Sequence, residues 1–319
     1  MRPEEWRRGG IALLLAALLN LHPLAAVAQG GRFEYRELHM GVEVRLVLQA
    51  AGQPAADSGA RAAFAAVAVL EQRLSDWRPT SEVRQLTLHP RQWRRVSVPL
   101  YQVLARAVEL ARASEGAFDP TAGPLVALWR EARRTRRLPD SGAVAAARAR
   151  TGWRLLRLRP ASREVWLERD SMLIDLGGIA KGFILDQAGQ LLRRRGISRF
   201  LIEAGGDIVV GDAPAGRPGW EIAVKTPRGD TTLALVNVGV GTSGPGAQHL
   251  DLDGVRYSHV IDPRTGWALT RAIEVTVVHP VGALSDALAT LVTVAPRAGA
   301  RIARKMGAVL ILEHDTPLP

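Results

Sequence analysis

The chain has 319 residues, with 42 Lys and Arg against 31 Asp and Glu, which gives a formal net charge of +11 at pH 7. Hydrophobic residues make up 47% of the chain, enough for a substantial core, so extensive disorder is excluded. There is no cysteine, which excludes disulfide frameworks, thiolate nucleophiles and cysteine-bound metals. A bound metal ion would therefore need oxygen or imidazole ligands.

The positive charge is almost entirely arginine, since only Lys181, Lys225 and Lys305 are lysines. This uneven usage indicates a compositional bias, and no nucleic-acid-binding motif accompanies it, so we expect no nucleic-acid partner. The densest basic run, residues 130–137, is interpreted as a solvated helix face or loop, and a polyanion site is the alternative.

Residues 1–28 have the order of a secretory signal peptide. Arginines precede an apolar stretch at residues 11–19, and small residues at 26–28 offer a cleavage site near Ala28. The apolar stretch is shorter than the roughly 20 residues that a membrane-spanning helix needs. We therefore expect an exported, periplasmic protein whose mature domain is residues 29–319, with no lipid anchor because no cysteine is present.

Alternation of apolar and polar residues predicts strands, and apolar residues at helical spacing predict helices. In chain order these are a strand at 42–49, a turn at 52–59, helices at 60–74 and 99–114, strands at 155–158, 164–167 and 172–175, a helix at 179–195, strands at 200–203, 208–210, 220–224, 232–238, 257–261 and 274–278, helices at 285–294 and 298–305, and a strand at 308–312. Because no regular βαβ period is present, we predict an α+β fold with mixed, largely antiparallel sheets, packed helices and two lobes in one compact unit.

Glycine-rich turns mark two places where a ligand could approach the main chain. Residues 175–182 pass from a strand end through two glycines into a helix, and Lys181 adds a positive charge that would suit phosphate. Residues 203–207 form either a tight hairpin or the second side of a dinucleotide-sized cleft. Residues 242–244 form a third, polar turn that could donate hydrogen bonds to phosphate. Each of these turns also has an interpretation without a ligand.

A possible proton-transfer residue lies in residues 259–266. The preceding strand is predicted to end at Asp262, because Pro263 cannot donate to a sheet, so His259 would stand near an exposed strand end. Histidine can accept a proton from a hydroxyl near neutral pH. A surface histidine beside an aspartate that closes a turn is the alternative.

Asp286 and Thr290 are four residues apart in a predicted helix that is otherwise mostly apolar, so they share one face. A carboxylate and a hydroxyl at this spacing suit Mg²⁺, which usually keeps water and substrate phosphate as further ligands. The alternative is helix capping, with Ser285 at the N-cap and Asp286 favoured by the helix dipole.

Taken together, these motifs resemble the ApbE family, the FAD:protein FMN transferases. The family's motifs occur in the same order, including residues 74–83 and 116–125 and the early pair Met40-Gly41, and the likeness covers nearly the whole mature chain. One departure follows Leu128-Trp129, where the family commonly reads Gly-Phe-Gly and this chain reads Arg130-Glu131-Ala132.

The resemblance implies a Mg²⁺-dependent transfer of FMN from FAD to a threonine hydroxyl of an acceptor flavoprotein, which is expected to be membrane-associated, with release of AMP. His259 would transfer the proton, supported by Asp262. The FAD contacts carried over are Met40, Trp77, Ala117, Phe118, Asp119, Lys181 and Ile261. The metal ligands carried over are Asp286, Thr290 and backbone oxygens of Gly178 and Ala289. A Mg²⁺-dependent FAD pyrophosphatase and a non-catalytic flavin-binding protein remain alternatives.

Overall fold

A computed structural model describes residues 30–226, 229–244, 248–271 and 273–314, so the predicted signal peptide lies outside the described residues. The strands are β1 (Gly31–His39), β2 (Val42–Ala50), β3 (Arg94–Arg95), β4 (Leu156–Arg159), β5 (Glu164–Leu167), β6 (Phe200–Ala204), β7 (Asp207–Val210), β8 (Trp220–Val224), β9 (Thr231–Leu235), β10 (Gly239–Ser243), β11 (His249–Leu252), β12 (Val255–Ser258), β13 (Ile273–His279) and β14 (Val309–His314). The helices are α1 (Gln53–Leu74), α2 (Glu82–Thr87), α3 (Val98–Ala113), α4 (Gly123–Thr135), α5 (Ser141–Arg148), α6 (Ala180–Arg194), α7 (Gly282–Val294) and α8 (Pro296–Lys305), with a short 3₁₀ turn at Trp153–Leu155.

A seven-stranded sheet in the order β1-β2-β6-β7-β10-β13-β14 organises the fold, and all its neighbouring strands are antiparallel. The central strands of the sheet are buried on both faces. In β2, for example, Val44, Leu46 and Leu48 enter the main core, whereas Val47 enters a second core on the opposite face. The predicted α+β class with largely antiparallel sheets is confirmed.

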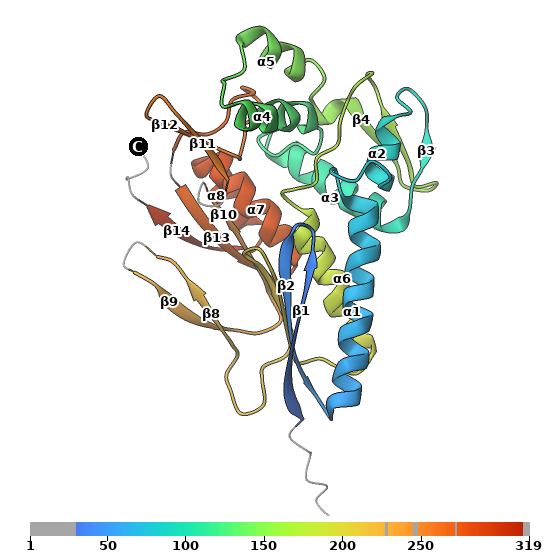
Figure 1. The fold of residues 1–319 in the computed structure, drawn as a ribbon, viewed down its shortest axis with the longest axis vertical. Coiled ribbons are helices and arrows are strands. Elements are labelled where there is room, and N and C mark those ends of the chain that lie inside the picture. The colour runs from blue at the N-terminus through green and yellow to red at the C-terminus, as the bar shows by residue number, and fades with distance from the viewer. Residues whose placement is uncertain (1–29, 227–228, 245–247, 272, 315–319) are drawn as a thin grey trace, which may run out of the picture.

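Helices α1, α6 and α7 cover one face of this sheet (Figure 1). The apolar positions of α1 recur at helical spacing, with Phe64, Val67 and Leu74 buried against the sheet. Helix α7 is apolar almost all round because it lies between the sheet and neighbouring helices, and this apolar environment makes its buried Asp286 conspicuous. The hairpin β8–β9 covers the other face, where Trp220 and Ile222 pack against Val47.

Helices α4 and α5 pack with the hairpin β11–β12 around Trp129 (Figure 1). The Trp129 indole stacks on Tyr257, with ring centroids 5.6 Å apart, and its Nε1 donates to the Gly266 carbonyl at 2.9 Å. Helix α4 is thereby fixed beside the segment that contains His259.

Three local predictions are wrong. Residues 53–59 belong to α1 instead of a turn. Pro54 lies in the first turn of the helix, where its missing N–H costs no hydrogen bond, and Gly59 lies against Ile197, which would be 2.4 Å from an added Cβ. Residues 172–175 are not a strand: the Asp175 amide donates to the Pro120 carbonyl, and the segment packs against the start of α4. The predicted turn at 242–244 is largely strand, since β10 continues through Ser243 opposite Val275.

Several elements were not predicted. Strand β1 is a mostly exposed edge strand with charged residues on both faces, so it lacks a clear alternation. Helix α4 is rich in arginine toward its end, so the helical spacing of its apolar residues was not recognised in the sequence. Within the described residues, no helix is both long and apolar enough to cross a membrane.

Candidate functional site

The loop before α6 brings main chain against α7. Asp175 Oδ1 accepts a hydrogen bond from the Gly177 amide at 2.8 Å, which holds the turn. A Cβ added to Gly178 would lie 3.0 Å from Thr290 Oγ1, closer than side chains normally pack. Glycine at this position therefore lets the main chain approach the Thr290 hydroxyl, as the predicted metal site requires.

The first turns of α6 and α7 pack closely at Gly182 and Gly282. A Cβ on Gly182 would lie 2.1 Å from the Gly282 carbonyl oxygen, so no other residue fits there without moving the backbone. The Gly182 amide donates to Asp286 Oδ2 at 3.2 Å. The first turn of α6 thus holds the carboxylate of α7 in place.

Lys181 bridges two buried carboxylates. Its Nζ lies 2.5 Å from Asp207 Oδ2 and 4.0 Å from Asp286 Oδ1. Asp207 is only 3% exposed and follows the β6–β7 turn, where Gly205 and Gly206 have φ of +56° and +94°. The predicted hairpin is confirmed. It places the Asp207 carboxylate beside Lys181, a contact that was not predicted from the sequence.

Burial raises the pKa of Asp286 to about 7, and the nearby Asp207 carboxylate adds to the effect. Burial works against the charged form of Lys181, but Asp286 and Asp207 outweigh it and hold the Lys181 pKa above its ordinary value. One lysine therefore faces two buried acids. A further cation beside Asp286 would satisfy the remaining negative charge.

The capping alternative for this helix is wrong. Helix α7 begins at Gly282, so Ser285 lies inside it and its hydroxyl donates to the Gly282 carbonyl at 2.8 Å. The cap comes from α6, where the two Asp186 oxygens accept from the Gly282 and Ala283 amides at 2.8 and 2.9 Å. Asp286 is thus left free of any capping role.

The donor set at α7 fits an oxygen-bound cation such as Mg²⁺. It combines the 5% exposed carboxylate of Asp286, the hydroxyl of Thr290 and the main chain of Gly178. The Ala289 carbonyl also accepts the Thr293 hydroxyl at 2.9 Å. Across the described ranges, no group of three or more His, Cys, Asp or Glu side chains is arranged for a metal, so the predicted site relies on one carboxylate with neutral oxygens.

Trp77 lies at the open side of the site and is 69% exposed. The Arg130 guanidinium covers one face of its indole, with Cζ 3.8 Å from the ring centroid. Arg130 also pairs with Asp76 at 2.7 Å and lies 3.7 Å from Asp175. This arginine therefore joins the Trp77 loop to the glycine turn that leads into α6.

His259 is partly buried, directly after β12, where the prediction had extended the strand. Its Nδ1 lies 3.1 Å from the Gln248 carbonyl, which can only accept, so Nδ1 carries the proton and Nε2 has the free lone pair. Burial lowers the pKa of His259, and the charges of Arg133 and Lys181 lower it further. The hydrogen bond to the Gln248 carbonyl raises this pKa but does not outweigh the other effects. The imidazole is therefore neutral at pH 7.

Asp262 is not brought to His259. Its carboxylate accepts from the Arg264 side chain at 2.9 and 2.8 Å and from the Arg264 amide at 3.0 Å, and its carbonyl closes the turn at Gly266. The Gln248 carbonyl orients the imidazole instead.

Most of the other predicted FAD contacts are buried residues or residues that form hydrogen bonds within the protein. Ala117, Phe118 and Ile261 are buried in the two cores, so their side chains pack within the protein. The Asp119 oxygens accept from Thr121 and from the Trp153 amide, and the φ of Met40 is +54° in the β1–β2 turn.

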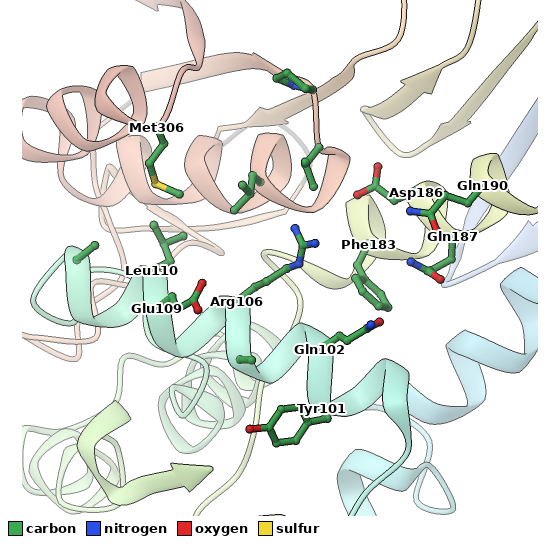
Figure 2. Close-up of a pocket in the computed structure, with 15 residues that line it drawn as sticks. Tyr101, Gln102, Arg106, Glu109, Leu110, Phe183, Asp186, Gln187, Gln190 and Met306 are labelled. Atoms are coloured by element: carbon green, nitrogen blue, oxygen red, sulfur yellow. The ribbon is translucent and has the colours of Figure 1, made fainter. Parts of the chain in front are cut away.

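A separate cavity of about 830 Å³ lies between α3, the outer side of α6 and the start of α7. Figure 2 shows Arg106, Glu109 and Gln187 among its lining residues, with Asp186 at the edge that faces α7. None of the predicted flavin, metal or proton-transfer residues lines it, so the glycine-rich site lies elsewhere.

Phosphorylated ligands are bound where a helix start, a cation and glycine-lined main chain converge. The first turn of α6 offers all three. The charge of Lys181 also contributes to the lowered pKa of His259. An imidazole free to take a proton beside such a turn is typical of an enzyme that acts on phosphate esters or anhydrides.

Comparison with known proteins identifies the particular family. Residues 40–311 match the sequence profile of the ApbE family, and the chain belongs to this family. The FAD:protein FMN transferase of Klebsiella pneumoniae (strain 342) is 32% identical over 251 residues, covering 74% of this chain and 71% of that protein. The protein of the same name from Treponema pallidum (strain Nichols) is 35% identical over 210 residues, covering 60% of this chain and 58% of that one.

Solved structures agree with this assignment. The ApbE protein of Thermotoga maritima is 30% identical, with a TM-score of 0.79, and the match covers 88% of this chain and 94% of that one. The flavin transferase ApbE of Vibrio cholerae is 26% identical, with a TM-score of 0.80, and the match covers 90% and 94% of the two chains.

Proposed function

We propose that this protein is a flavin transferase that moves FMN from FAD to a threonine hydroxyl of an acceptor flavoprotein, releases AMP and requires Mg²⁺. Its membership of a family whose curated relatives are named FAD:protein FMN transferases supports the reaction class. The observation that carries the proposal is the close approach of the Gly178 main chain to Thr290 beside the buried Asp286. The charge of Lys181 also helps to lower the pKa of His259, which is neutral.

Asp286, Thr290 and the main chain of Gly178 would hold the metal ion, with Ala289 as a further predicted ligand. When bound, Mg²⁺ would neutralise the diphosphate and polarise the phosphorus that is attacked. Lys181 is held in its charged form beside this place, and it would contribute a second positive charge toward the phosphates.

His259 would act as the general base. Its Nδ1 is committed to the Gln248 carbonyl, so Nε2 takes the proton from the acceptor hydroxyl. The hydroxyl oxygen then forms a bond to the phosphorus of the FMN half, the bond between that phosphorus and the bridging oxygen breaks, and AMP leaves with the bridging oxygen. Because burial lowers the His259 pKa, the base is already unprotonated at neutral pH.

The test is to incubate the chain with FAD, Mg²⁺ and a purified acceptor domain, and then to denature the mixture. We expect a flavin-fluorescent acceptor band, a mass increase equal to FMN esterified to the acceptor, and loss of the label when the target threonine is replaced by alanine. Omission of Mg²⁺ with EDTA should abolish labelling. Free FMN and AMP without any labelled protein would indicate a pyrophosphatase, and FAD binding without turnover would indicate a flavin carrier.

We also propose that the chain is exported and acts on a membrane-associated acceptor in the periplasm. The order of basic, apolar and small residues within residues 1–28 supports this location. Amino-terminal sequencing of the protein recovered from the periplasmic fraction should find a start near residue 29. Recovery of the intact amino terminus in the cytoplasm would contradict the proposal.

A further inference from the structure

Helix α4 carries three arginines, of which Arg130 and Arg133 are partly buried and Arg134 is exposed. Arg130 and Arg133 are three residues apart and share one helix face. Arg134, in contrast, is largely exposed and pairs with Glu131 on the same helix. The basic run is therefore not a uniformly solvated face, and each of the two partly buried arginines has a distinct environment.

Arg130 fixes an exposed aromatic ring from one side. Its guanidinium lies 3.8 Å from the Trp77 centroid, and Asp76 at 2.7 Å and Asp175 at 3.7 Å hold it there. The opposite face of the Trp77 indole is left open, because the side chain is 69% exposed. An indole braced by a cation on one face is a ready stacking surface for a planar ring on the other.

Arg133 is a half-buried cation that lacks an anionic partner. Among the described residues, none forms an ion pair or a hydrogen bond with its side chain. Burial and the charge of Arg130 lower its pKa, and its own charge is felt at His259. A desolvated, unpaired guanidinium favours an anion, and phosphate fits its planar donor geometry.

We propose that α4 supplies a two-part binding face for the flavin dinucleotide, in which Arg130 positions Trp77 against the flavin ring and Arg133 binds an anionic phosphate group. The inference rests on the proposed function and deepens it. Arg130 is a positioning residue, and Arg133 contacts the substrate.

The two roles are separated by comparing FAD with riboflavin, which has the same ring system and no phosphate. Equilibrium binding is measured by flavin fluorescence for the wild type, Arg130→Gln and Arg133→Gln. Arg134→Gln removes the same charge from the same helix and serves as the matched control. All variants are first compared by thermal unfolding, and Arg130→Lys keeps a cation if Arg130→Gln does not fold.

For Arg133→Gln we expect FAD to bind roughly 10-fold more weakly, while riboflavin binding changes less than about 2-fold. For Arg130→Gln we expect both ligands to bind roughly 3- to 30-fold more weakly, with less quenching of flavin fluorescence by Trp77. Arg130→Lys should recover part of this loss. In a Trp77→Ala background, Arg130→Gln should have no further effect on riboflavin.

Equal weakening of FAD and riboflavin by Arg133→Gln would overturn its assignment as a phosphate ligand. A full effect of Arg130→Gln in the Trp77→Ala background would overturn the positioning role. If both variants behave as Arg134→Gln does while the wild type binds FAD and labels an acceptor, the inference fails and the proposed function stands. A wild type that does not bind FAD would instead contradict the proposed function.

Discussion

The two sides of the site are built in different ways. The buried half is formed by Gly178, Lys181, Gly182, Asp207 and Asp286, and the open half by Trp77, Arg130, Arg133 and His259. In the buried half, main chain touches main chain or a carboxylate, as where the Gly182 amide meets Asp286 at 3.2 Å. In the open half, side chains from α4 and two loops hold one another, as where Arg130 covers Trp77 at 3.8 Å.

This difference indicates which changes each half tolerates. A main-chain contact leaves no room for a larger residue, so the buried half depends on glycine and on paired charges. Side-chain contacts on partly exposed residues can be altered one at a time, so the open half can adjust ligand affinity without loss of the fold. The predictions below test this distinction, from the largest expected effect to the smallest.

The most severe change is expected from Gly182→Ala in the buried half. The new methyl group would lie 2.1 Å from the Gly282 carbonyl oxygen, which belongs to the backbone and cannot rotate away. We expect a loss of about 3 kcal/mol or more in the free energy of unfolding, measured by urea denaturation. Gly142→Ala at an exposed position of α5 is the control and should change stability by less than about 1 kcal/mol. A Gly182→Ala protein as stable as the control would refute the close approach of α6 and α7.

In the open half, His259→Ala should reduce the transfer rate by roughly 10² to 10⁴ with little change in stability. FAD binding should remain within about 2-fold, because the residue acts on the acceptor proton. Burial lowers the pKa of His259, and a base must be unprotonated, so the wild-type rate should rise with pH through a midpoint below the ordinary histidine value of 6.5 and then level off. A rate that still climbs between pH 7 and 8 would argue against His259 as the base.

Asp286→Asn tests the metal site with almost no change of shape. We expect Mg²⁺-dependent transfer to fall by roughly 100-fold or more, since a charged oxygen ligand becomes a neutral one. Titration of Mg²⁺ followed by thermal unfolding should show a stabilisation in the wild type that the variant lacks. Ser285→Ala, which removes a hydroxyl of the same helix that donates to the Gly282 carbonyl, is the comparison. Equal Mg²⁺ stabilisation of the wild type and Asp286→Asn would place the ion elsewhere.

The same residue makes the metal-free protein sensitive to pH. Burial raises the folded-state pKa of Asp286 to about 7, above the ordinary value of 3.8, so between these pH values the folded state binds more protons than the unfolded state. Stability of the EDTA-treated wild type should therefore decrease as pH rises from about 4 to 7. Asp286→Asn removes this contribution, and its Tm should decline less over that window. Parallel Tm profiles for the two proteins would contradict the raised pKa.

A smaller effect is expected at the cap of α7. Asp186 accepts from the Gly282 and Ala283 amides, so Asp186→Ala should lower the free energy of unfolding by about 1–2 kcal/mol. Ser285→Ala removes the hydroxyl that the sequence suggested as the cap. Because Ser285 lies inside the helix, we expect it to cost less than Asp186→Ala in the same urea experiment. The reverse order would restore the capping role of Ser285.

Local signals were enough to locate most of the buried half. Glycine pairs, a helix start after Gly178 and the i, i+4 spacing of Asp286 and Thr290 are properties of short segments, and the structure brings these segments together. The sequence did not identify Asp207, because its importance comes only from Lys181, which is 26 positions earlier in the chain and reaches it at 2.5 Å.

The open half was much less predictable. Arg130 belongs to a run of arginines that looks like a solvated face. Its contacts with Trp77, Asp76 and Asp175 distinguish it from Arg134, which pairs with Glu131 on its own helix. The family resemblance implied that Asp262 supports His259. In the folded chain the Asp262 carboxylate pairs with Arg264, and the His259 imidazole contacts the Gln248 carbonyl.

The amino-acid sequence alone determined the fold class, the family likeness and the glycine and carboxylate positions, because periodicity, turn residues and short spacings act over a few residues. The tertiary structure decided which charged side chains meet, which residue caps α7 and that Arg130 contacts Trp77. Those choices depend on contacts between segments far apart in the chain, and local preferences do not specify them.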